Sequence, residues 1–202
     1  MRSQFGTFDE YLDDVEVLPA QPVHSWVGGD ELGAGESLAP GRYIFQSELD
    51  KYAGNYSRCL HEHTASFITG RWSLGTNAFV VYRHKFAGLN FTSALVKATL
   101  NYYGSGALLV EAGTNGQDWL EAGRLQPATA GWRAAVLQTN VPPALLPAPE
   151  LYVRLRATGN LQVNDYRFEG DLPGNALQAV GRTWLLEQYK QDATILPVQM
   201  SL

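Results

Sequence analysis

The strongest constraint on the fold is a two-residue hydrophobic alternation that recurs between Gly- and Pro-containing turns. Residues 78–86 carry an apolar or aromatic side chain at every second position, and residues 94–102 repeat the pattern. A period of two places these side chains on one face of a β-strand. Similar short runs follow at intervals of roughly 8–12 residues, which is typical of a sandwich or barrel. The sequence therefore predicts an all-β domain, and we find no βαβ pattern.

Turn signals bound the predicted strands. The pair Asn115-Gly116 lies between two of them and accepts the positive φ angles of a tight hairpin. Residues 183–189 can form a strand or belong to a short helix over 176–191, and we favour the strand. The other expected strands cover residues 42–47, 66–71, 78–86, 94–102, 107–112, 119–125, 132–139, 151–158 and 161–168.

The first 41 residues lack this alternation. They combine an acidic cluster with a Gly-rich segment that runs from Gly28 to Gly41. We therefore expect an irregular lead-in over residues 1–41 and a β-sandwich domain over residues 42–202. A chain of 202 residues is long enough for one domain with a sizeable core.

Charge and hydropathy exclude several kinds of partner. The chain carries 15 Lys and Arg against 20 Asp and Glu, a net charge of -5, and its basic residues are scattered singly. We therefore expect no nucleic-acid partner and no binding to an anionic membrane surface. No segment approaches the roughly 20 apolar residues of a membrane span. Residues 1–16 show no signal-peptide pattern, which leaves open a cytoplasmic protein and a piece of a longer secreted one.

Three segments carry a resemblance to a known family. Residues 104–124 contain a strand, an Asn-Gly hairpin and a Trp-led strand, residues 149–158 read PELYVRLRAT, and residues 159–169 read GNLQVNDYRFE. They resemble the galactose-binding-like, jelly-roll β-sandwich family, which includes discoidin-type domains and many carbohydrate-binding modules. The resemblance implies a jelly roll of about 8–10 antiparallel strands.

The same resemblance implies a function. It predicts a non-catalytic module that binds a glycan or polysaccharide, lies outside the cell or at the cell surface, and is joined to other domains of a parent protein. Many relatives bind no sugar and act as spacers. The alternative is therefore a structural or assembly domain without a small-molecule ligand.

A sugar-binding site needs an exposed aromatic face beside side chains that hydrogen-bond to hydroxyls. The predicted site combines three stacking residues from loops or strand ends with two polar residues, namely Trp72, Tyr56, Tyr103, Arg71 and Asn164. The competing interpretation is that Trp72 packs over the end of the core. We expect core packing for Trp119 and Trp132, because each opens a predicted strand.

One candidate metal site combines a cysteine with two histidines. Cys59, His61 and His63 stand at alternate positions, so an extended strand would place them on one face, and such ligands suit zinc or copper. A closed site needs a fourth ligand, which His24 or His84 could supply. The competing interpretation is a polar strand face with one buried thiol.

A second candidate metal site follows from the resemblance. Jelly-roll relatives often hold a structural calcium ion, and Glu48, Asp165 and Asp171 are the matching acidic residues here. The competing interpretation is that these are solvated acids. We expect no other cofactor.

No motif indicates catalysis. The sequence has no nucleophile elbow, no H-E-x-x-H and no Walker A motif. Carboxylates for glycoside hydrolysis could come from Glu48, Asp50, Glu62 or Glu111, but their spacing selects no pair. We therefore expect a protein that is not an enzyme.

Overall fold

A computed structural model describes residues 32, 35–39, 41–47, 49, 59–86 and 88–173, together with the backbone of 183–187 and 196–200. The chain divides into two units, one covering residues 33–176 and the other covering 1–32 and 177–202. The first unit holds the sandwich. Tyr56, Glu48, Asp50 and His24, which the sequence singled out, lie outside the described residues.

The larger sheet of the sandwich, sheet A, is antiparallel throughout. Its central strand is β12, which pairs with β7 on one edge and with β2 and β5 on the other; β1 then pairs with β2, β4 with β5, and β10 with β7. The strands of sheet A are β1 (Glu36–Ala39), β2 (Arg42–Gln46), β4 (Ser66–Phe67), β5 (Trp72–Leu74), β7 (Ser93–Tyr103), β10 (Ala135–Asn140) and β12 (Leu161–Asp171).

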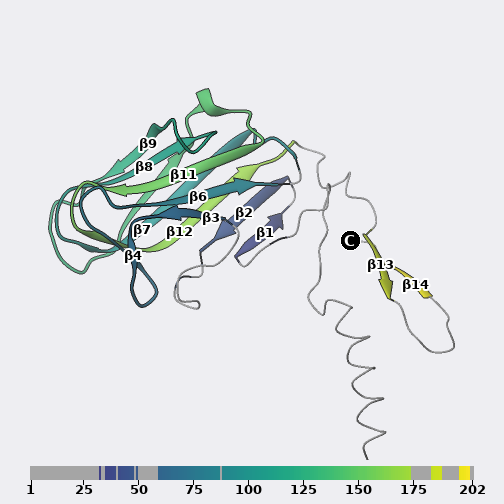
Figure 1. Cartoon of the computed structure of the whole chain (residues 1–202), viewed down its shortest axis with the longest axis horizontal. Helices are drawn as coiled ribbons and strands as arrows, with labels where there is room; N and C mark the ends of the chain where they lie inside the picture. Colours follow the sequence, from purple (N-terminus) through teal and green to yellow (C-terminus); the bar gives the residue numbers. More distant parts are fainter. Residues whose placement is uncertain are drawn as a thin grey trace, which may run out of the picture. The chain divides into compact units, whose positions relative to one another are not determined.

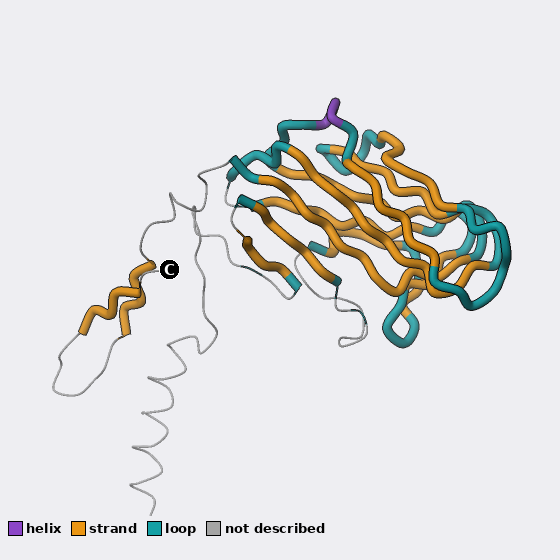
Figure 2. Tube along the Cα trace, turned by 180° about the vertical axis from the view of Figure 1, so that it is seen from behind, coloured by secondary structure: helices purple, strands orange, loops and turns teal. Residues whose placement is uncertain are grey.

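The second sheet, sheet B, lies against sheet A (Figure 1). Its strands follow the order β3-β6-β11-β8-β9, and every pair is antiparallel. They are β3 (Leu60–His63), β6 (Phe79–Lys85), β8 (Leu108–Gly113), β9 (Leu120–Leu125) and β11 (Glu150–Ala157). Seen from the opposite side, the strands are joined by loops, one of which carries the short 3-10 helix η1 (Pro143–Leu145) (Figure 2). The fold is an all-β jelly-roll sandwich, as predicted.

Aromatic rings from both sheets fill the core. On β6, Val80, Tyr82 and His84 are fully buried, which confirms the face predicted for residues 78–86. The Tyr82 ring stacks on Tyr166 of β12 with centroids 4.2 Å apart, and the His84 ring stacks on Phe168 at 3.9 Å. These contacts join the two sheets.

The predicted face of residues 94–102 is only partly right. Ala94, Val96, Ala98 and Leu100 are buried, but Tyr102 is not. Register shifts in the pairing of β7 with β12 break the alternation, as in a β-bulge, because an extra residue sets the following side chains on the other face.

Several strand boundaries differ from the prediction. β1 lies inside the expected lead-in, residues 66–71 give only the short β4, and the strand expected over 132–139 begins at Ala135. Strands this short carry too few residues for a period to show. As a result, the described residues form seven strands in sheet A and five in sheet B, more than the 8–10 expected.

Two strands of the second unit form a sheet of their own. β13 (Thr183–Glu187) pairs antiparallel with β14 (Leu196–Met200). The strand favoured for residues 183–189 is thus confirmed over Thr183–Glu187. Within the described part of the chain, no helix has the length and apolar character that a bilayer span requires.

Candidate functional site

Charged side chains on the outer face of sheet B form ion pairs with one another. Glu111 on β8 accepts hydrogen bonds from Arg154 at 2.7 Å and Arg156 at 2.8 Å, both on β11. The Arg154 guanidinium also lies over the Trp119 ring, 4.3 Å from its centroid. Burial alone would raise the pKa of Glu111, but the hydrogen bonds from the two arginines outweigh it and lower the pKa. Glu111, Arg154 and Arg156 thus satisfy one another.

The outer face of sheet A is built differently, because two irregularities turn extra side chains outward. The pairing of β12 with β7 shifts register between Gln162 and Val163 and again between Val163 and Asp165. Asn101 and Tyr102 on β7 therefore both lie outside the core, and so do Asn164 and Asp165 on β12. The consequence is a concentration of amide and aromatic side chains at one end of the sheet.

An exposed tryptophan lies at this end. Trp132, just before β10, has 63% of its surface exposed, the highest value among the large apolar residues of the described chain. Its ring packs against Tyr102 with centroids 4.9 Å apart, and the Arg71 guanidinium lies over it at 5.4 Å. Gln162 is the direct cross-strand neighbour of Tyr102. We call Arg71, Asn101, Tyr102, Trp132 and Gln162 the Trp132 cluster.

Three polar atoms of the Trp132 cluster lack a protein partner. Nε of Arg71, Oδ1 of Asn101 and Oε1 of Gln162 are shielded from solvent and make no hydrogen bond. Such groups cost roughly 1–3 kcal/mol each when left unpaired. The terminal torsions of Asn and Gln are soft, so these amides can turn toward a ligand. The cluster therefore combines an open aromatic surface with unused hydrogen-bonding capacity.

A polar pocket lies further along the same face. It has a volume of about 220 Å³ and is lined by Leu95, Lys97, Gln138, Arg167 and Glu169. Arg167 donates a hydrogen bond from Nε to Glu169 at 2.7 Å, and this bond holds the pKa of Glu169 below its ordinary value. We call this feature the Lys97 pocket.

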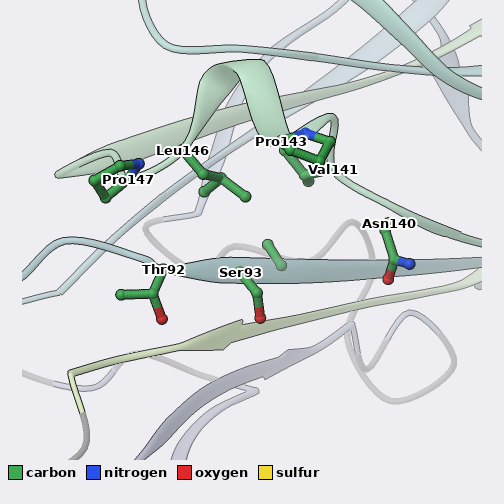
Figure 3. A pocket seen from close by; sticks show the side chains of 8 residues that line it. Thr92, Ser93, Asn140, Val141, Pro143, Leu146 and Pro147 are labelled. Carbon is green, nitrogen blue, oxygen red and sulfur yellow. The ribbon is translucent and has the colours of Figure 1, made fainter.

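A larger pocket lies at the start of β7. It has a volume of about 540 Å³, and Figure 3 shows the loop residues Pro143, Leu146 and Pro147 across from Thr92 and Ser93. Its lining contains no charged side chain and no aromatic ring. It offers a ligand fewer specific contacts than the Trp132 cluster.

The structure separates the residues of the predicted sugar site. Trp72 is 1% exposed and donates its Nε1–H to the Tyr82 hydroxyl at 2.9 Å, so it packs in the core and offers no face to a sugar. Tyr103 is also buried, and its hydroxyl donates to the Gly106 carbonyl at 2.9 Å. Arg71 belongs to the Trp132 cluster, and Asn164 is exposed on the same outer face.

The three residues of the predicted transition-metal site do not form one. Within the described residues, no group of three His, Cys, Asp or Glu side chains is arranged to hold a metal. Cys59 is buried beside the Tyr43 hydroxyl, at 3.1 Å, whereas His61 and His63 are exposed. An irregularity between Leu60 and Glu62 breaks the alternation on which the prediction depended.

The other candidate ligands have protein partners. His84 is in the core, where Nε2 lies 2.8 Å from the Tyr166 hydroxyl. Asp165 accepts a hydrogen bond from Gln46, and Asp171 accepts one from Arg42 at 2.7 Å and another from Ser93. A calcium ion at Asp165 or Asp171 stays a prediction.

The prediction that Trp132 packs in the core is wrong, because its side chain is 63% exposed. The prediction assigned Trp132 to the core because it was expected to open a strand. Gly131-Trp132-Arg133 mirrors Gly70-Arg71-Trp72, in that a Gly precedes a Trp and an Arg. The choice between the two tryptophans could not be made from these triplets, because it depends on where β5 and β10 begin.

Comparison with known proteins gives weak structural similarities. No protein-family model matches the chain, and none of the curated proteins does. Among solved structures, the chain is similar to a carbohydrate binding module of family 29, with 14% identity, a TM-score of 0.39, and coverage of 64% of this chain and 86% of that one.

Two further solved structures have sequence identities and TM-scores in the same range. The C-terminal family 6 module of the laminarinase LamC from Zobellia galactanivorans has 18% identity and a TM-score of 0.36, covering 62% of this chain and 98% of that one. The isomalto-dextranase of Arthrobacter globiformis has 13% identity and a TM-score of 0.41, covering 65% of this chain and 24% of that one. All three structures have a low sequence identity to this chain and a low TM-score.

Proposed function

We propose that this chain is a carbohydrate-binding module whose ligand lies on the outer face of sheet A, against Trp132. The observation that carries the proposal is the pairing of a 63% exposed indole with three unpartnered polar atoms on Arg71, Asn101 and Gln162. A sugar ring has an apolar face of C–H groups and a rim of hydroxyls. The indole suits the face, and the amides and guanidinium suit the rim.

The energetics favour a polar ligand over a purely apolar one. An apolar molecule would cover Trp132 but leave the oxygens of Asn101 and Gln162 unpaired, at a cost. A hydroxyl can donate to each oxygen and accept from Arg71. Arg71 already lies over the indole, which fixes the platform before the ligand arrives and lowers the entropy lost on binding.

The proposal includes a non-catalytic role. The Trp132 cluster contains no carboxylate, histidine or cysteine that could act as a general acid, base or nucleophile. Asp165, the nearest acidic position along β12, holds a hydrogen bond from Gln46. We therefore expect incubation with a bound polysaccharide to release no new reducing ends.

Affinity electrophoresis on gels that contain neutral polysaccharides tests the proposal. We expect at least one glucan, mannan or galactan to retard the protein, and Trp132→Ala to weaken that binding about tenfold or more, a loss of about 1.4 kcal/mol. The matched control is Trp119→Ala, which removes a tryptophan from the opposite face of the sandwich and should leave retardation unchanged.

Two results would contradict the proposal. One is no retardation on any polysaccharide, neutral or acidic, by a protein whose thermal unfolding shows that it is folded. The other is equal loss of binding in Trp119→Ala and Trp132→Ala. Light scattering tests the alternative of an assembly domain. If the protein forms a defined oligomer and Trp132→Ala dissociates it, the exposed indole serves a contact between protein chains.

A further inference from the structure

The Lys97 pocket and the Trp132 cluster share the outer face of sheet A. The side chains of Lys97 on β7 and Arg167 on β12 lie directly opposite each other, as do those of Tyr102 and Gln162 nearer the other end of the same two strands. At about 3.3 Å per residue, the span from Lys97 to Tyr102 is roughly 15 Å, longer than one sugar ring. A ligand that touches both must be a chain of several sugars.

The Lys97 pocket carries an unbalanced positive charge. Lys97 and Arg167 are a like-charged cross-strand pair, an arrangement that destabilises a sheet unless something neutralises it. Arg167 is neutralised by Glu169, its hydrogen-bond partner at 2.7 Å. Lys97 has no carboxylate within ion-pairing distance among the residues that the structure describes, so one cation remains over a pocket of about 220 Å³.

Glu169 cannot compensate both cations. It already forms a second ion pair, at 2.8 Å, with Arg42 on β2. The Arg167 guanidinium also donates to Gln46, at 3.4 Å, on β2, which pairs with β12 on the side away from β7 and Lys97. The pocket is thus a fixed polar frame with one free ammonium group and the amide of Gln138 beside it.

We infer that the Lys97 pocket binds an anionic substituent, a carboxylate or a sulfate ester, on the same glycan chain that stacks on Trp132. This inference rests on the proposed function and narrows its ligand to an acidic polysaccharide. Both substituents offer the oxygen acceptors that Lys97 and Gln138 can reach. The chain as a whole has a net charge of -5, so general attraction to polyanions does not supply this preference.

Titration calorimetry with three sets of oligosaccharides tests the inference, namely oligogalacturonate, its methyl ester and a sulfated galactan oligosaccharide. We expect the carboxylated or the sulfated form to bind at least about fivefold more tightly than the neutral ester. The preference should shrink as salt is raised, because exposed charges are screened. Whichever acidic form binds more tightly identifies the substituent.

Two variants change the pocket in opposite directions. Lys97→Gln should abolish the preference for the acidic form without changing affinity for the neutral one. Glu169→Gln should increase the preference, because it removes the only carboxylate of the pocket lining. Lys85→Gln is the control, since Lys85 is an exposed lysine at the end of β6 in sheet B.

The outcomes separate this inference from the proposed function. Equal affinity for acidic and neutral forms, or an acidic preference that Lys97→Gln leaves intact, would overturn the inference. The proposed function would still stand if Trp132→Ala weakens binding in the same experiments. Loss of neutral binding in Lys97→Gln would also overturn it, because the lysine would then serve a general structural role. Absence of binding to every glycan would refute the proposed function itself.

Discussion

At the scale of single residues, His84 is a titratable side chain that the core buries completely. Its ring lies 3.9 Å from Phe168 in a parallel stack, and Nε2 lies 2.8 Å from the Tyr166 hydroxyl. Nδ1 is buried without a hydrogen-bond partner in the structure. Because desolvation penalises the charged imidazolium, burial lowers the pKa of His84 to about 3. The residue considered as a metal ligand is thus a neutral core group.

Stability should therefore depend on pH through His84. The unfolded chain binds a proton at this residue below about pH 6.5, whereas the folded protein does so only near pH 3. The free energy of unfolding should fall by about 1.4 kcal/mol per pH unit as the pH drops below 6.5. Urea titrations of the natural protein and His84→Phe, at about pH 7 and about pH 5, measure the effect. Equal pH slopes in the two proteins would contradict it.

The contrast between Trp72 and Trp132 shows why a site residue is hard to predict from sequence. Each tryptophan stands next to an arginine in a triplet that begins with glycine. The side chain of Trp72 is nevertheless 1% exposed, whereas that of Trp132 is 63% exposed. Trp72 is buried because β5 pairs with β12 so that Trp72 lies opposite Val163. That long-range register leaves no local signature. Arg71 lies against the Trp132 ring and Asn164 is exposed on the outer face of sheet A, and their role as sugar-binding residues stays a prediction.

At the scale of elements, the long strands could be predicted and their irregularities could not. The alternation in residues 78–86 identifies β6 and its buried face, since a half-buried strand requires that pattern. The register shifts between β7 and β12 depend on the pairing of residues far apart in the chain. They reverse the orientation expected for Tyr102, and this reversal creates the platform on which Trp132 rests.

The ion pairs on the outer face of sheet B support a prediction at this scale. Glu111 is 6% exposed and bridges Arg154 and Arg156. Glu111→Gln should lower the free energy of unfolding by about 1–3 kcal/mol at neutral pH, because two arginines lose a charged partner. Since the pKa of Glu111 is lowered in the folded protein, its contribution is present above the ordinary carboxyl pKa and lost below it.

Denaturant titrations across the acidic range test this expectation. The difference between the natural protein and Glu111→Gln should shrink as the pH falls below the ordinary glutamate value of about 4.3. Glu121→Gln is the control, because Glu121 forms an exposed pair with Arg124 on the neighbouring strand β9. A similar effect of both substitutions would show that burial of Glu111 contributes nothing.

At the scale of the whole molecule, the boundary of the sandwich differs from the position at which the sequence pattern changes. Alternation begins near residue 42, but β1 (Glu36–Ala39) is already hydrogen-bonded to β2. Glu36 accepts a hydrogen bond from the Tyr43 hydroxyl inside the sandwich. A strand of four residues next to Pro40 and Gly41 carries too little periodicity to distinguish it from a loop.

This boundary can be tested with two truncated chains. A chain of residues 33–176 should unfold in one cooperative transition and keep the ligand binding of the full chain, because it contains both sheets. A chain of residues 42–176 lacks β1 and should be less stable by about 1–3 kcal/mol, since the buried Tyr43 hydroxyl loses a partner. Equal stability of the two chains would show that β1 contributes nothing to the sandwich.

The difference in exposure between Trp72 and Trp132 also affects the fluorescence of the protein. The indole of Trp72 donates its N–H to Tyr82 inside the core, whereas that of Trp132 lies beside the cation of Arg71 at the surface. Iodide in solution can collide with Trp132 but not with Trp72. The chain has five tryptophans, so the quenching that the natural protein shows and Trp132→Ala lacks reports whether the indole of Trp132 is covered, without any label on the protein or the sugar.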